Sequence, residues 1–200
     1  MLSVNKLLPD VNPSVPRMGN TVTRFLGRSL LRLLGWRVRG ELPEQKKLIL
    51  IAAPHTSNWD FVTAMAGVCA TGVKWSYMMK KEAFIFPLKS FFLKIGGIPI
   101  DRNQTEGLVE QVADAFKKKD KLWLAMTPDG TRGKAYEYKT GFLRIAQLAE
   151  VPILVIGWNY PTKEIVLDHI WNTTGDHVQD AADIRAYINK HYTGRHPENQ

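Results

Sequence analysis

The fold is decided by the stretch LILIAAPHTSNWDF at residues 48–61. Its first four residues form a short, continuous apolar run, which is typical of a buried strand. The residues that follow, from Phe61 to Ala70, have the apolar pattern of a helix that packs against such a strand. His55 therefore lies where a strand is followed by a helix, the sheet edge at which α/β proteins bind ligands.

His55 and Asp60 are candidates for a reactive pair, because an imidazole accepts a proton near neutral pH and a carboxylate can fix its tautomer. On a regular helix, residues five apart point about 140° away from each other. The two side chains can therefore meet only if His55 precedes the helix and Asp60 lies in its first turn. Ser57 is a good N-cap, and Asp60 three residues later completes a capping box. A cap alone, with His55 uninvolved, is the alternative interpretation.

The composition is that of one folded domain. The chain has 200 residues, of which 44% are hydrophobic and 23% are charged. A single cysteine, Cys69, excludes an internal disulfide and a cysteine zinc site, and it favours a reducing compartment. The formal net charge of +8 indicates an anionic partner: nucleic acid, anionic lipid or an acidic protein. No zinc-finger spacing or RNA-binding aromatic motif supports nucleic acid.

Strands and helices are expected to alternate along the chain. Strands are expected at 38–42, 47–53, 74–79, 98–100, 122–126, 151–158 and, as an edge strand, 164–167; helices are expected at 61–70, 105–119, 138–150 and 178–192. This order predicts a single α/β domain over residues 37–192, with a mixed, mostly parallel sheet flanked by helices. An irregular segment at 1–20 and an amphipathic helix at 21–36 precede it, and a polar tail at 193–200 follows.

The helix at 21–36 has two distinct sides. Arg24, Arg28 and Arg32 recur every four residues, whereas leucines and Phe25 supply the apolar side. Such a helix can lie in a membrane interface, or it can pack its leucines on the domain, and both can hold on different faces. No apolar run approaches the roughly 18 residues of a transmembrane helix.

Three further features remain ambiguous from the sequence alone. The segment 80–95 mixes apolar and lysine residues, so it is either a core helix interrupted at Pro87 or a lysine-rimmed apolar surface. Arg102 follows an expected strand. Its guanidinium either binds a phosphate, or Arg102 is only a surface residue beside Asp101. The loop at 127–133 follows another strand, and it either binds an anion or is an ordinary Pro-Asp-Gly turn. The remaining histidines have no ligand spacing and are expected on the surface: His169, His177, His191 and His196.

Together, four motifs resemble the glycerolipid acyltransferase superfamily, of the lysophosphatidic acid acyltransferase type. His55 and Asp60 match its His-x-x-x-x-Asp motif, and residues 97–102 resemble its glycine- and arginine-containing motif. Residues 128–132 are similar to its Pro-Glu-Gly-Thr-Arg motif, and 151–153 match its proline between aliphatic residues. Asp129 stands where the family has glutamate and Thr127 where it usually has phenylalanine, which suggests an altered acceptor pocket.

The resemblance implies transfer of a fatty acyl group from acyl-ACP or acyl-CoA to the hydroxyl of a lyso-glycerolipid, with lysophosphatidic acid favoured. His55 would be the general base and Asp60 would orient it. The residues expected to hold the acceptor are Arg102, Asp129, Gly130, Thr131 and Arg132, with Arg102 at the phosphate. No metal, bound cofactor or nucleic acid is implied.

The expected location is the cytoplasmic face of an anionic membrane, as a peripheral or monotopic protein. Two alternatives stay open: another lyso-lipid acceptor, such as a lyso-aminolipid or a different lysophospholipid, or a non-catalytic lipid-binding protein of the same fold.

Overall fold

The main sheet has five strands in the order β1-β7-β6-β2-β5 in the computed structural model, which describes residues 7–101 and 107–200. The strands are β1 (Arg37–Gly40), β2 (Lys47–Ala53), β5 (Leu122–Met126), β6 (Ile153–Asn159) and β7 (Glu164–Trp171). The central strand β2 pairs in parallel with both β5 and β6. On the far side, β7 runs antiparallel to β6 and parallel to β1.

Two more strands extend this sheet beyond β5. β3 (Tyr77–Lys80) and β4 (Gly97–Ile100) pair in parallel with each other. Ser76, just before β3, forms a parallel bridge to Leu124 and donates its N–H to the Trp123 carbonyl at 2.7 Å. The carboxyl ends of β2, β3, β4 and β5 therefore face the same edge, the position at which parallel sheets bind ligands.

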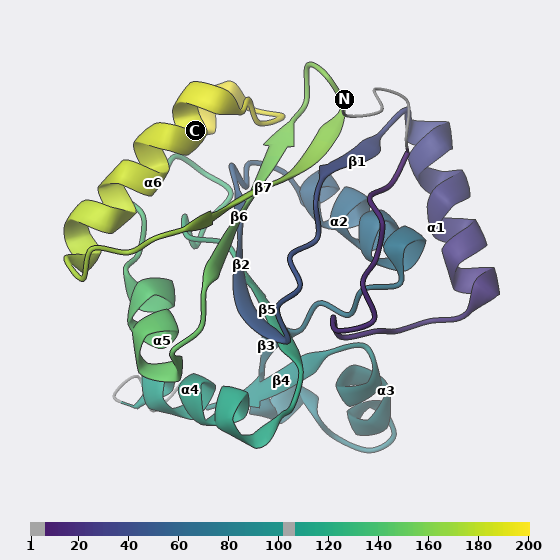
Figure 1. Ribbon diagram of the computed structural model, residues 1–200, viewed down its shortest axis with the longest axis horizontal. Helices are drawn as coiled ribbons and strands as arrows, with labels where there is room; N and C mark the ends of the chain where they lie inside the picture. Colours follow the sequence, from purple (N-terminus) through teal and green to yellow (C-terminus); the bar gives the residue numbers. More distant parts are fainter. Residues whose placement is uncertain (1–6, 102–106) are drawn as a thin grey trace.

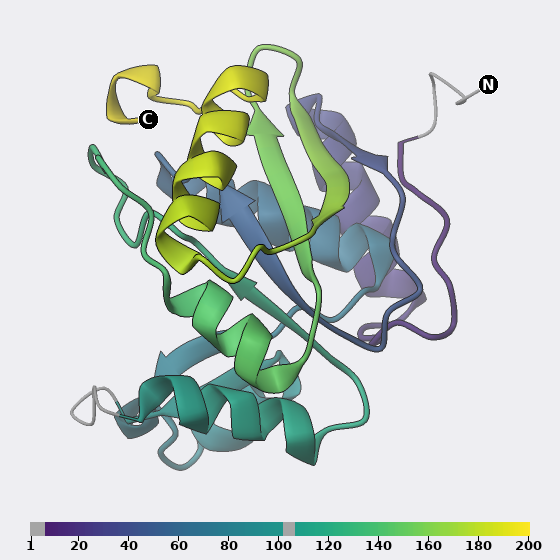
Figure 2. The same cartoon turned by 60° about the vertical axis from the view of Figure 1, so that its left-hand side comes forward.

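Helices cover both faces of the sheet (Figures 1 and 2). α1 (Thr21–Leu34) and α2 (Asn58–Thr71) lie on one face; α4 (Leu108–Lys118), α5 (Gly141–Ala149) and α6 (His177–His191) lie on the other. The central strand serves both cores because successive side chains point to opposite faces. Ile49 and Ile51 pack toward α4, α5 and α6, whereas Leu48 and Leu50 pack toward α1 and α2.

The predicted fold class is confirmed, and β2 and β5 have the predicted bounds. The prediction of an edge strand at 164–167 is wrong. β7 continues to Trp171 and lies between β6 and β1, because the short strand β1 pairs with it from Arg37 opposite Glu164. Glu164 also binds the guanidinium groups of Arg37 and Arg39 at 2.7 and 3.0 Å, which stabilises this pairing.

The interpretation of segment 80–95 as a core helix is also wrong. It forms a 3₁₀ turn η1 (Lys81–Ala83) and a short helix α3 (Leu88–Lys94) that buries none of its residues. Phe86 is 95% exposed, and Ile85, Leu88 and Phe91 are exposed as well. The segment is therefore a lysine-rimmed apolar surface, the alternative that the sequence left open.

α1 packs closely on α2 at Gly27 and turns an apolar side outward. Gly27 lies so close to α2 that an added Cβ would be 2.4 Å from the Ala70 nitrogen. Leu31 is buried beside it, whereas Leu33 is 83% exposed and Phe25 and Leu26 are also exposed. The expectation that this helix packs on the domain is therefore met on one side, and contact of its exposed apolar side with a membrane stays a prediction. Within the described residues, no helix has the length and apolarity needed to cross a membrane.

Candidate active site

The site is built on the loop that joins β2 to α2. Ser57 is the N-cap of α2, and its hydroxyl accepts a hydrogen bond from the Trp59 N–H at 3.2 Å. Asp60 is the third residue of the helix, and its Oδ2 accepts from the Ser57 N–H at 2.9 Å. The predicted capping box is therefore present, and it places the Asp60 side chain beside the preceding loop.

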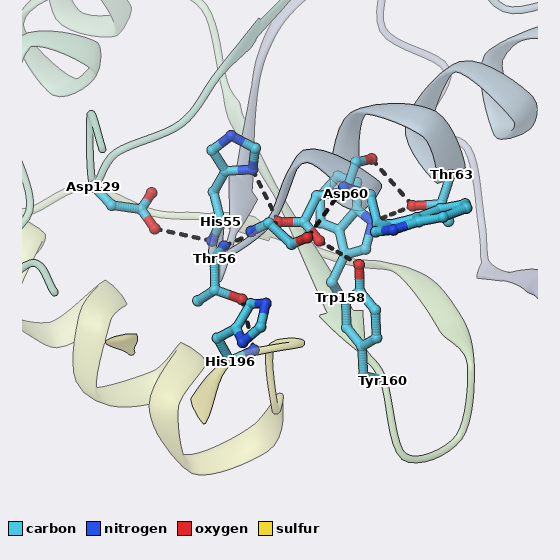
Figure 3. Close-up of polar contacts among 10 residues, drawn as sticks. His55, Thr56, Asp60, Thr63, Asp129, Trp158, Tyr160 and His196 are labelled. Atoms are coloured by element: carbon cyan, nitrogen blue, oxygen red, sulfur yellow. Dashed lines mark hydrogen bonds and ion pairs between the residues drawn. The ribbon is translucent and has the colours of Figure 1, made fainter. Parts of the chain in front are cut away.

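His55 and Asp60 are in contact (Figure 3). The imidazole Nδ1 lies 3.1 Å from Asp60 Oδ2, and the two side chains are 17% and 2% exposed. The capping box and the His55–Asp60 pair therefore share one group, the Asp60 carboxylate, and occur together. The ring's other nitrogen, Nε2, points away from Asp60 and has no hydrogen-bond partner within the described residues. This geometry suits an imidazole that donates from Nδ1 and accepts a proton at Nε2.

Both oxygens of Asp60 are held by further donors. Oδ2 also accepts from the Thr56 N–H at 2.9 Å, and Oδ1 accepts from the Tyr160 hydroxyl at 2.5 Å. Burial, and then this hydrogen bond to Asp60, raise the pKa of Tyr160. Thr63 and Trp158 are linked behind Asp60 by a 2.9 Å bond from the indole N–H to the Thr63 hydroxyl. Asp60 therefore has one fixed orientation.

The N–H groups at the start of α2 are largely used within the protein. Those of Thr56 and Ser57 donate to Asp60, and that of Trp59 donates to the Ser57 hydroxyl. These three N–H groups are therefore already paired and are not free to bind an anion. The N–H groups of Thr56 and Ser57 instead fix the carboxylate that orients His55.

Asp129 connects the loop after β5 to His55. Its Oδ2 accepts the backbone N–H of His55 at 2.9 Å, as Figure 3 shows. Its Oδ1 is buried and has no hydrogen-bond partner within the described part of the chain. Burial raises the pKa of Asp129; the His55 N–H lowers it and the nearby charge of Asp60 raises it, with a net upward direction. Asp129 thus supports the loop that carries the imidazole.

The other residues of this loop are less closely engaged. Gly130 has φ +64° and donates its N–H to the Thr127 carbonyl at 3.2 Å, so the Pro-Asp-Gly turn is present. Thr131 and Arg132 are exposed. Their binding of an anion remains a prediction, as does that of Gly130. Arg102 lies outside the described residues, although β4 ends just before it at the same sheet edge.

Sequence reasoning missed two parts of the site. Tyr160 directly follows β6, a parallel neighbour of β2, so the rule that polar residues follow strands could have identified it. The segment at 193–200, expected as a polar tail, folds back onto the loop: the His196 N–H donates to the Thr56 hydroxyl at 3.1 Å. No local pattern signals that contact.

Within the ranges 7–101 and 107–200, no cluster of three or more His, Cys, Asp or Glu side chains could hold a metal ion.

Comparison with known proteins defines the class. The family model described as Acyltransferase matches residues 36–158, more than half of the chain, and the chain therefore belongs to the acyltransferase family. Among solved structures, it is similar to the 1-acyl-sn-glycerophosphate (LPA) acyltransferase PlsC from Thermotoga maritima, with a TM-score of 0.59 and 14% identity. The match covers 84% of this chain and 76% of that one, and it supports the fold. No curated protein matches the sequence.

Proposed function

We propose that this acyltransferase moves a fatty acyl group from acyl-ACP or acyl-CoA to the hydroxyl of a lyso-glycerolipid, with lysophosphatidic acid the favoured acceptor. One observation carries the proposal: His55 pairs with buried Asp60 at 3.1 Å and leaves Nε2 open. A hydroxyl is a weak nucleophile until a base removes its proton. In the proposed reaction His55 Nε2 takes that proton as the oxygen attacks the thioester carbonyl. The tetrahedral intermediate then expels the thiolate, which receives the proton back from Nε2.

Asp60 has a supporting role in this reaction. A carboxylate at Nδ1 keeps the imidazole in the tautomer whose Nε2 is unprotonated, and it stabilises the imidazolium that forms. Because Thr56, Ser57 and Tyr160 all donate to Asp60, the carboxylate need not reorient during the reaction. Preorganised charge of this kind lowers the activation barrier more than a mobile group does.

The proposed acceptor site surrounds the same sheet edge. Arg102 would bind the phosphate, since a guanidinium grips it through paired hydrogen bonds. The loop of Asp129, Gly130, Thr131 and Arg132 would hold the rest of the head group, and its contact with the His55 backbone places it next to the base. The similar protein PlsC acts, by its name, on 1-acyl-sn-glycerophosphate, which favours the same acceptor here.

Contact with a membrane would give the enzyme access to its lipid acceptor. The outward side of α1 presents Phe25, Leu26 and Leu33 to solvent, and the lysine-rimmed surface of α3 presents more apolar residues. Both helices lie away from the layer of α4, α5 and α6 (Figure 1). Apolar side chains with nearby cations suit an anionic membrane surface. We place the protein at the cytoplasmic face, bound peripherally or monotopically.

A second acceptor class is favoured by one residue. Asp129 is one methylene shorter than the glutamate of the family motif, and its carboxylate is bound to the His55 N–H. A pocket altered at this position could accept a lyso-aminolipid or another lysophospholipid instead.

A panel of substrates distinguishes the acceptors. Purified protein is incubated with labelled acyl-CoA or acyl-ACP and with lysophosphatidate, other lysophospholipids or a lyso-aminolipid. The proposal expects the highest kcat/KM with lysophosphatidate. Reaction only with acceptors that lack a glycerol phosphate would show that the lysophosphatidate assignment is wrong. No transfer with any combination of donor and acceptor would favour a non-catalytic lipid-binding protein.

A further inference from the structure

The C-terminal segment (residues 193–200) lies against the loop that carries His55. It follows Tyr192, whose buried ring packs over Gly157 and whose hydroxyl donates to Asp168 at 2.5 Å. From this anchor the chain crosses the start of α2, where the Arg195 guanidinium lies 5.2 Å from the centre of the Trp59 ring. The segment expected to be a solvated tail is therefore packed against residues of the first motif.

Thr56 is the point at which the segment reaches the catalytic pair. Its hydroxyl is buried and accepts the His196 N–H at 3.1 Å (Figure 3). Its own N–H donates to Asp60 Oδ2 at 2.9 Å. One residue thus connects the C-terminal segment with the carboxylate that orients His55.

A second connection passes through Tyr160. The Tyr160 N–H donates to the Thr193 carbonyl at 2.9 Å, and its hydroxyl donates to Asp60 Oδ1 at 2.5 Å. The C-terminal segment is therefore hydrogen-bonded to two of the residues that donate to the Asp60 carboxylate: Thr56 on Oδ2 and Tyr160 on Oδ1. Such a closed set of hydrogen bonds restricts the position of every member.

The segment is held in shape by its own contacts. The Gln200 side chain accepts from the Gly194 N–H at 3.0 Å and donates to the Tyr192 carbonyl at 2.8 Å. Gly194 also lies very close to the loop, because an added Cβ would be 2.7 Å from the Thr56 hydroxyl oxygen and 3.2 Å from Pro54. A side chain at this position would have to displace Thr56.

We infer that the C-terminal segment positions the His55–Asp60 pair, with Thr56 as the positioning residue that transmits this effect. The inference rests on the proposed function, because the positioned groups are its base and carboxylate. Displacement of Thr56 would move an N–H away from Asp60 Oδ2 and loosen the imidazole. Misplacing a catalytic group by about 1 Å can cost about a hundredfold in rate.

Two variants test the inference in the full chain. Thr56→Val removes the acceptor for the His196 N–H but keeps the Thr56 N–H; Gly194→Ala pushes on the Thr56 side chain. Thr56→Ser restores the hydroxyl, and Gly141→Ala is the matched glycine control, because nothing lies within 4 Å of its added Cβ. The measurements are kcat, KM for the acceptor, thermal stability, and hydrogen exchange of the Thr56 and Ser57 amides.

We expect both test variants to lower kcat by about tenfold to a hundredfold, with little change in acceptor KM. The Thr56 and Ser57 amides should exchange faster, and Thr56→Ser should recover most of the lost rate. Wild-type kcat and wild-type exchange in both Thr56→Val and Gly194→Ala would overturn the inference. If Gly194→Ala fails to fold, Thr56→Val and Thr56→Ser decide alone.

A wrong assignment of the proposed function would give a different result from a wrong positioning inference. Wild-type protein would then be inactive with every donor and acceptor, whereas the amide exchange would still report whether the C-terminal segment holds the loop. Unchanged exchange in both variants would overturn the positioning inference in that case too.

Discussion

The backbone N–H of His55 donates a 2.9 Å hydrogen bond to Oδ2 of Asp129, 74 residues further along the chain. This bond joins the loops that follow two adjacent parallel strands, β2 and β5. The carboxylate therefore sits behind the imidazole and fixes the backbone that carries it. The residue type at position 129 consequently affects the position of His55, and in the proposed function it affects the acceptor pocket as well.

Asp129→Asn should change how stability depends on pH. Burial raises the pKa of Asp129 above its ordinary value of 3.8, so the folded state binds this proton more tightly than the unfolded state. The contribution of Asp129 to stability therefore falls as pH rises from about 4 through the raised folded pKa. Asparagine keeps an oxygen for the His55 N–H but carries no charge.

We expect the free energy of unfolding of Asp129→Asn, relative to wild type, to increase from pH 4 to pH 7. Urea denaturation at a series of pH values measures it, with Asp120→Asn, an exposed carboxylate, as the control. A difference that stays constant or decreases over this range would contradict the burial of a charge at residue 129.

Asp60→Asn should impair both catalysis and folding. Every atom that contacts the two carboxylate oxygens in the structure is a donor or can act as one: the N–H groups of Thr56 and Ser57, the His55 ring and the Tyr160 hydroxyl. An amide NH₂ at the Oδ2 position would face the two backbone N–H donors, and at the Oδ1 position it would deprive the Tyr160 hydroxyl of its acceptor. We expect kcat to fall by about a hundredfold or more and unfolding to become easier by about 1–3 kcal/mol. A threefold or smaller loss of kcat would show that Asp60 serves only as a cap.

Tyr160→Phe should have an effect of the same kind, with a smaller loss of kcat. It removes the donor to Asp60 Oδ1 but keeps the ring, which packs edge-on against Trp36 with centroids 4.8 Å apart. We expect a loss of about 1–3 kcal/mol in stability and a severalfold decrease in kcat at unchanged acceptor KM. Tyr136→Phe, at an exposed tyrosine, is the control. The same kcat for Tyr160→Phe and Tyr136→Phe would show that the Tyr160 hydroxyl does not contribute to catalysis.

Membrane binding should depend on the outward side of α1. The double variant Phe25→Glu and Leu33→Glu replaces exposed apolar side chains, so folding should be unaffected while binding to anionic vesicles weakens by about tenfold or more. Val178→Glu, an equally exposed position on α6, is the control. Changing Arg24, Arg28 and Arg32 to Glu should also reduce co-sedimentation. Unchanged vesicle binding in both α1 variants would place the contact elsewhere, with the α3 surface the next region to test.

The local part of this structure could be predicted from the sequence, because short-range constraints determine it. The apolar run of β2, the N-cap at Ser57 and the spacing of His55 and Asp60 define one strand, one helix start and one side-chain contact. The contacts that complete the site are long-range. The position of Tyr160 directly after β6 places it at the sheet edge but does not reveal that its hydroxyl binds Asp60, and nothing at 193–200 indicates packing against Thr56.

Burial was the least predictable property. The apolar residues of segment 80–95 resemble a core helix in composition, yet α3 lies on the surface. Likewise, composition alone does not reveal which side of α1 faces α2, because that depends on the close approach at Gly27. Hydrophobicity indicates that a segment avoids water, but not whether protein or lipid covers it.

The most direct test is the rate of acyl transfer by His55→Ala. Purified wild type and variant are supplied with labelled acyl thioester and lysophosphatidate, with folding of the variant checked by its melting temperature and by vesicle binding. The proposed mechanism predicts that kcat falls by about a hundredfold or more while the variant stays folded and membrane-bound. A folded His55→Ala protein that transfers the acyl group at the wild-type rate would contradict it.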